Sequence, residues 1–237
     1  IERYGHEIVS TDSVVIKEAL QTIVRRCPAD NYSLVLWSHG SGWAPAPERR
    51  RTIGIDNDHN WPSNVGKETE ISELRWALEQ SGVHWRYVMF DACFMQCAEV
   101  AYELRNVTDW MIGSPAEIPA MGAPYDELMP AFFSSRAPEE ITSVYYDYYE
   151  NTDGLVISAV KTSAMEALRT ATLQCPATVA ARPIDDVQQY GMCLPGNGYL
   201  PEFYDISSAM YHWLSPAHYA QWRAALEAAV PYRHGLH

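Results

Sequence analysis

Two residues with reactive side chains follow two apolar segments of the chain. Residues 32–37 lead to His39, and residues 85–90 lead to Cys93. An apolar run of about six residues, bounded by polar residues or Gly, is typical of a strand buried on both faces of a parallel sheet. Ligands and catalysis occur at the carboxyl ends of such strands. The pattern therefore predicts that His39 and Cys93 meet at one sheet edge, as a nucleophilic thiol and the base that takes its proton.

Other roles are common for these residue types. A free Cys is often buried as a small hydrophobic residue, and a lone His usually lies at the surface or is satisfied in the core. Two details favour the catalytic interpretation. Gly40 leaves room for a close backbone approach and offers a free N–H beside His39, and Cys93 opens an apolar pattern of helical spacing. A thiol at a helix N-terminus faces the positive end of the dipole, which predicts a pKa below the usual value of about 8.5.

Three short stretches carry a family resemblance: LVLWSHGSGW at 34–43, FDACFM at 90–95 and EVAYEL at 99–104. They resemble the clostripain-like cysteine peptidases, over roughly residues 1–160. The resemblance implies a caspase-like α/β sandwich, a dyad of His39 and Cys93, and cleavage after Arg or Lys. It also implies that Asp91 is the acidic residue at the base of the primary specificity pocket. His39 and Cys93 are 54 residues apart, close to the spacing of roughly 50 in caspases.

The expected elements alternate along the chain and indicate an α/β fold, a caspase-like three-layer sandwich with a mostly parallel central sheet flanked by helices. The right-handed crossover rule makes the strands at 32–38 and 85–90 parallel. We expect a single peptidase domain over 1–237, with its core at about 12–160 and a less defined region at 161–237. Further strands are expected at 109–113 and 155–160, and helices at 12–26, 69–81, from Cys93, 125–133, 138–150, from 163, 204–213 and 216–230.

The remaining segments are expected to lack regular structure. Residues 41–68 read as one long connection, and residues 175–204, rich in Pro and Gly, read as a surface segment. Members of the resembled family usually have at least one strand before the helix at 12–26 and more sheet after the last helix. We therefore expect the chain to be truncated at both ends.

Composition narrows the possible partners. A formal net charge of −13 argues against tracking nucleic-acid phosphates and is compatible with basic peptide or protein substrates. No run reaches the 18 apolar residues expected of a membrane span. A start at Ile1 without Met is what processing or trimming of a longer chain leaves, so we expect an exported, extracytoplasmic protein. The sequence leaves the oligomeric state open.

No cofactor is expected. The five cysteines lack the spacing of a metal site. The run from Asp56 to His59 lacks the Gly and the terminal Glu of an EF-hand, so a turn is the better interpretation. A calcium requirement therefore stays open without a motif to support it.

The predicted chemistry is amide hydrolysis through a thioester. His39 would take the thiol proton and later protonate the leaving amine, while the N–H groups of Gly40 and Cys93 would stabilise the oxyanion. Asp91 lies two residues before Cys93, so both side chains can point to the same side of the strand end, and a carboxylate there suits Arg or Lys. Alternatively, Asp91 caps the following helix. Glu117 and Asp126 could add a second acidic wall.

Three consecutive basic residues, Arg49, Arg50 and Arg51, stand in a Pro-rich segment shortly after His39. A solvated charge run is their commonest role. The resembled family is activated by internal cleavage in the connection between His and Cys, so we predict self-processing after one of these residues.

Two other functions compete with the peptidase. A caspase-like scaffold could act as a binding module without significant activity, or the dyad could serve a hydrolase of small amides. An oxyanion loop of the α/β-hydrolase type is disfavoured, because HGSG at 39–42 is not accompanied by a Gly-x-Ser-x-Gly elbow.

Overall fold

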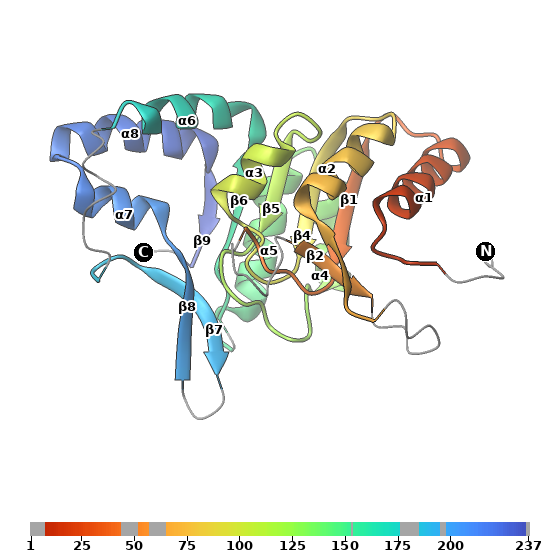
Figure 1. The fold of residues 1–237 in the computed structure, drawn as a ribbon, viewed down its shortest axis with the longest axis horizontal. Coiled ribbons are helices and arrows are strands. Elements are labelled where there is room, and N and C mark those ends of the chain that lie inside the picture. Colours follow the sequence, from red (N-terminus) through yellow and green to blue (C-terminus); the bar gives the residue numbers. More distant parts are fainter. Residues whose placement is uncertain are drawn as a thin grey trace.

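A computed structural model describes residues 8–43, 52–56, 65–152, 154–175, 185–194 and 198–235. Its central sheet has the strand order β1-β4-β5-β6-β9 (Figure 1). Strands β1, β4 and β5 are parallel, and β6 pairs antiparallel with both β5 and β9. The sheet is therefore mixed but mostly parallel. The bounds of its strands are β1 Tyr32–Trp37, β4 Trp85–Asp91, β5 Trp110–Gly113, β6 Ile157–Lys161 and β9 Tyr232–His234.

Helices cover both faces of this sheet and complete three layers (Figure 1). Strand β4 shows why: Val88 and Phe90 face one apolar cluster, and Tyr87 and Met89 face the other, as the two-residue period of a strand requires. The helices packed on the Val88 side are α1 Ser13–Arg26, α2 Ile71–Gln80, α3 Ala98–Leu104, α6 Met165–Leu173, α7 Ile206–Trp213 and α8 Pro216–Ala229. Those on the Tyr87 side are α4 Tyr125–Phe132 and α5 Ala137–Tyr149.

Local sequence explains where several helices begin. Asp12 caps α1 by accepting hydrogen bonds from the Val14 and Val15 N–H groups at 2.8 and 3.3 Å. Helix α2 begins with a capping box between Glu70 and Glu73. A short 3-10 turn, η1 Thr162–Ala164, leads into α6. Among the residues that the structure describes, no helix has both the length and the apolar character needed to cross a membrane.

Two antiparallel ribbons lie in segments that the sequence pattern left without regular structure. The first pairs β2 Thr52–Asp56 with β3 Lys67–Glu70, and the second pairs β7 Gln189–Leu194 with β8 Gly198–Tyr204. Strand β3 reads KETE and has no apolar alternation to reveal it. Strands β7 and β8 contain Gly191 and Pro201, which read as breaks but are tolerated in two-stranded ribbons and at bulges.

Two further expectations about elements need correction. The helix expected from Cys93 begins only at Ala98, and residues 93–97 form an irregular loop. The helix expected from residue 69 begins at Ile71, because residues 67–70 pair as β3.

Strand β9 follows the last helix and pairs with β6 at the edge of the central sheet. The apolar core on the Val88 side of the sheet extends as far as Ala229 in α8.

Candidate active site

The pairing of β1 with β4 brings the His39 and Cys93 loops together. Trp37 and Asp91 are register partners at the carboxyl ends of these parallel strands, and the Ser38 N–H points to the Asp91 carbonyl oxygen at 3.4 Å. His39 and Cys93 each lie two residues beyond these partners, so both leave the sheet at the same edge. His39 is exposed and Cys93 is half-buried.

Gly40 packs directly against the Cys93 loop. A Cβ atom at Gly40 would lie 2.6 Å from the Cys93 carbonyl oxygen and 2.8 Å from the Met95 sulfur, so any larger residue would push the two loops apart. On its other side, Gly40 bridges β2: the Gly54 N–H donates to the His39 carbonyl at 2.9 Å, and the Ser41 N–H donates to the Thr52 carbonyl at 3.1 Å. Because these bonds flank Gly40, its own N–H takes no part in the bridge.

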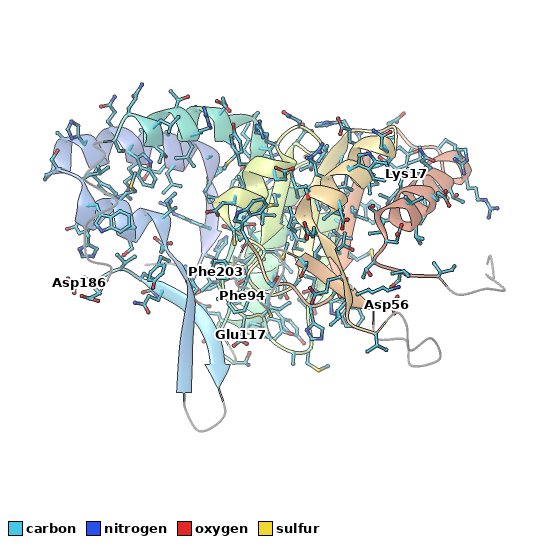
Figure 2. All side chains as sticks on the ribbon, in the orientation of Figure 1. Lys17, Asp56, Phe94, Glu117, Asp186 and Phe203 are labelled. Carbon is cyan, nitrogen blue, oxygen red and sulfur yellow. The ribbon has the colours of Figure 1, made fainter. Side chains whose placement is uncertain are left out.

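The residue after Cys93 holds a conformation rare for a side chain. Phe94 has φ of 62°, a left-handed backbone that costs a non-Gly residue about 1–2 kcal/mol. Its N–H donates to the Ala116 carbonyl at 3.0 Å, and its ring stacks on Phe203 of β8 with centroids 5.5 Å apart. Figure 2 shows both rings at the sheet edge, near Glu117. Tertiary contacts therefore impose the turn that presents Cys93.

The environment of the Cys93 thiol differs from the one predicted. Burial raises its pKa first, and the negative charges of Glu117 and Asp91 raise it further. The Ile118 N–H donates to Cys93 Sγ at 3.4 Å and acts in the opposite direction. The predicted lowering by a helix dipole is wrong, because α3 begins five residues after Cys93, with Cys97 as its cap. The thiol therefore needs a base to remove its proton.

Asp91 is fully buried and accepts three hydrogen bonds from neutral donors. The Ala123 N–H and the Tyr125 hydroxyl donate to Oδ2 at 3.0 and 2.8 Å, and the Tyr145 hydroxyl donates to Oδ1 at 2.9 Å. Burial of the two tyrosines, followed by the negative charge of Asp91, raises the pKa of both hydroxyls. The alternative that Asp91 caps the helix after Cys93 is wrong, since Cys97 occupies that position.

The other predicted acidic and basic residues lie in different places. Glu117 is half-buried and close enough to Cys93 for its charge to act on the thiol. Asp126 is exposed in the first turn of α4, and among the described residues no hydrogen bond joins it to Cys93 or Asp91. Arg49, Arg50 and Arg51 lie outside the described residues.

Sequence reasoning missed three side chains around Asp91. Tyr125 and Tyr145 come from α4 and α5, 34 and 54 residues further along the chain. Trp37, the last residue of β1, is 70% exposed, and the expectation that residues 32–37 are buried on both faces is wrong, because β1 is an edge strand with only half-buried and exposed residues. Its apolar run gave no sign of this, but its position at the carboxyl end of β1 could have marked it as a site residue.

The Asp56 segment forms no metal site within the described residues. Asp56 accepts hydrogen bonds from the backbone and the hydroxyl of Ser10 at 2.9 and 2.8 Å, and so ties the start of the chain to β2. Residues 57–59 lie outside the described ranges. In the part of the chain that is described, no three His, Cys, Asp or Glu side chains group closely enough to hold a metal ion.

Solved structures of bacterial cysteine proteases resemble this fold. A secreted C11 cysteine protease from Bacteroides thetaiotaomicron, in complex with an irreversible peptide inhibitor, has a TM-score of 0.79 and 32% identity over 95% of this chain and 64% of that chain. An inactive zymogen C11 protease from Parabacteroides distasonis has a TM-score of 0.79 and 29% identity over 99% and 64%. A B. fragilis cysteine protease has a TM-score of 0.59 and 28% identity over 77% of each chain.

The chain thus spans somewhat less than two thirds of the length of the first two of these structures. No protein among the curated sequences compared matches it. The sequence profile of the Clostripain family matches residues 1–188, which include the His39 and Cys93 loops and the whole segment between them. On this match, the chain belongs to the Clostripain family.

Proposed function

We propose that this protein is a cysteine endopeptidase that cleaves peptide bonds through a dyad of Cys93 and His39. The observation that carries the proposal is the register of Trp37 with Asp91, which sends both loops from the same sheet edge, with Gly40 packed on the Cys93 backbone. The likeness to a secreted cysteine protease bound to a peptide inhibitor supports both the activity and a place outside the cytoplasm.

In this mechanism, His39 takes the proton of the Cys93 thiol. Burial and two carboxylates keep the thiol pKa high, so the proton leaves as the thiolate attacks the substrate carbonyl carbon. The N–H groups of Gly40 and Cys93 stabilise the tetrahedral oxyanion. The protonated His39 then gives its proton to the leaving amine, and water hydrolyses the thioester to release the second product and the free thiol.

Substrates with Arg or Lys before the scissile bond suit the acidic side chains near the nucleophile. Asp91 has only neutral donors around it, and no ion pair to it exists among the described residues. A substrate cation would supply the missing countercharge. Glu117 adds a second negative charge beside Cys93, whereas the exposed position of Asp126 gives it at most a long-range role.

Self-cleavage after Arg49, Arg50 or Arg51 belongs to the same proposal. The Ser41 hydroxyl accepts from the Thr52 N–H at 3.1 Å, so the residues on either side of the segment 49–51 lie together beside the His39 loop. The pairing of β2 with β3 would hold the new chain end after such a cut. The likeness to an inactive zymogen agrees with activation by processing.

A covalent probe tests the peptidase against the two competing functions. We expect a peptide electrophile with a terminal Lys or Arg to label Cys93 much faster than it labels a free thiol, with the adduct located by mass spectrometry. Cys27→Ala, which removes an exposed thiol, should leave the labelling unchanged, and Cys93→Ala should abolish it. Labelling no faster than a free thiol would favour a binding module, and equal rates for neutral electrophiles would favour a small-amide hydrolase.

The processing proposal has its own measurement. Intact mass of the purified wild type should show cleavage after one of Arg49 to Arg51, while Cys93→Ala stays uncut. A fully active protein with an intact chain would contradict the proposal, and a cut in both proteins would indicate an outside protease.

A further inference from the structure

The Asp91 carboxylate has few acceptor positions left for a substrate. A carboxylate offers about four lone-pair positions, two on each oxygen. On Oδ2, both are used by the Ala123 N–H and the Tyr125 hydroxyl, at 3.0 and 2.8 Å. On Oδ1, the Tyr145 hydroxyl uses one at 2.9 Å. One acceptor position therefore remains, and it is on Oδ1.

This occupancy matters because Arg and Lys bind carboxylates differently. The guanidinium of Arg binds most strongly as a fork, with one N–H on each oxygen. The ammonium of Lys is a compact point charge that needs a single acceptor. With Oδ2 filled, Asp91 can accept a single donor but cannot receive the fork.

We propose that Tyr125 is a specificity-determining residue that makes the pocket prefer Lys over Arg. The inference rests on the proposed peptidase function and on Asp91 as the base of its primary pocket. Tyr125 is the donor that can be changed most simply, because it is 36% exposed in the first turn of α4, whereas Tyr145 is buried and Ala123 donates through its backbone.

Trp37 provides a second feature that suits a long basic side chain. The Trp37 side chain is exposed, with 70% of the residue accessible. A Cβ atom built on Gly122 would lie 3.2 Å from Trp37 Nε1 and 2.8 Å from Asp91 Oδ2, so the indole and the carboxylate both border Gly122. The rim above Asp91 thus holds an exposed aromatic face. Such a face packs well along the methylene stem of either Lys or Arg and attracts the positive charge, so it favours basic side chains without separating the two.

The test compares kcat/KM for three matched tripeptide reporters that carry Lys, Arg or norleucine before the scissile bond. We expect the wild type to favour Lys over Arg by about tenfold, the scale of one charge-assisted hydrogen bond. In Tyr125→Phe, an acceptor position on Oδ2 opens, so the ratio of Arg to Lys should rise by about tenfold. Tyr146→Phe is the matched control: it removes a hydroxyl of α5 that donates to Glu150 at 3.3 Å, and it should leave the ratio unchanged.

The outcomes separate this inference from the proposed function. Cleavage of Lys and Arg reporters without a Lys preference in the wild type would overturn the inference and leave the peptidase standing. So would a Tyr125→Phe variant with an unchanged ratio. Cleavage of the norleucine reporter alone would overturn the basic specificity as well, and no cleavage of any reporter would overturn the peptidase and the inference together. If Tyr125→Phe does not fold, a wild type without a Lys preference still overturns the inference.

Discussion

The thiol of Cys93 lies in surroundings that favour its protonated form. Burial is the largest cause of its raised pKa, and the charge of Glu117 is the larger of the two electrostatic causes that act in the same direction. A thiolate is the reactive species. At neutral pH, the raised pKa leaves less of the Cys93 thiol of the free protein ionised than in an ordinary Cys.

Replacing Glu117 with Gln removes one of these causes. We expect the pH profile of Cys93 alkylation by iodoacetamide to shift to lower pH in Glu117→Gln, because the thiolate then loses a repulsive neighbour. Glu99→Gln is the control, since Glu99 acts on Cys97 instead. Superimposable profiles for Glu117→Gln and the wild type would show that Glu117 does not face the nucleophile.

Asp91 combines a structural and an electrostatic role, and an isosteric substitution separates them. In Asp91→Asn, the amide oxygen can keep the bonds from Ala123 and Tyr125 while its NH₂ group donates to the Tyr145 hydroxyl. Stability measured by denaturant unfolding should therefore change by less than about 1 kcal/mol. kcat/KM for Lys and Arg reporters should fall by about a hundredfold, and far less for norleucine.

A larger truncation gives the contrasting result. Asp91→Ala leaves the buried donors unpaired, at about 1–3 kcal/mol for each. If Asp91→Asn instead lowered activity equally on all three reporters, the carboxylate would be structural and the specificity assignment would be wrong.

At the scale of elements, the β7–β8 ribbon supports the catalytic loop through one ring. The Phe203 ring stacks on Phe94. It also lies against Gly42 in the His39 loop, because a Cβ atom built on Gly42 would be 2.9 Å from Phe203 Cζ. One aromatic side chain thus contacts both the His39 loop and the Cys93 loop. Stacked pairs contribute about 0.5–1.5 kcal/mol beyond burial, which is comparable to the cost of the left-handed Phe94 backbone.

Phe203→Ala should therefore reduce catalysis more than stability. We expect kcat to fall by about tenfold, because the Cys93 loop relaxes from its strained turn, while the far-ultraviolet circular dichroism stays unchanged. As a control, Tyr211→Ala removes an exposed ring of α7 that contacts Tyr219 of α8. Equal kcat in Phe203→Ala and Tyr211→Ala would leave the ribbon without a role at the site.

The elements also show what sequence patterns can and cannot predict. The apolar runs at 32–37 and 85–90 and the right-handed crossover rule predict two parallel strands whose ends carry His39 and Cys93 to one edge, and the structure pairs these strands in parallel. The start of α3 is predicted wrongly from the sequence. The spacing of Met95 and Ala98 suggests a helix from Cys93, but contacts with distant residues such as Phe203 hold the turn at Phe94, and α3 begins only at Ala98. The same holds for the tyrosines on Asp91, which tertiary structure alone brings together.

At the scale of the whole molecule, the formal net charge of −13 adds a long-range attraction for basic substrates. Salt screens such attraction within about 8–10 Å at physiological ionic strength. kcat/KM for the Lys reporter should therefore fall as sodium chloride is raised from low to physiological concentration, while that for norleucine stays constant. A parallel decline for both reporters would indicate a general effect of salt on the protein.

The whole fold brings together two loops whose His39 and Cys93, 54 residues apart in the sequence, are the proposed base and nucleophile. The most direct test of that account is the hydrolysis of one Lys reporter by Cys93→Ala, His39→Ala and the double variant, each shown to be folded. Members of a dyad act as a unit, so we expect each single variant to lose nearly all turnover and the double variant to lose no more. A folded Cys93→Ala protein with turnover clearly above background would contradict the account.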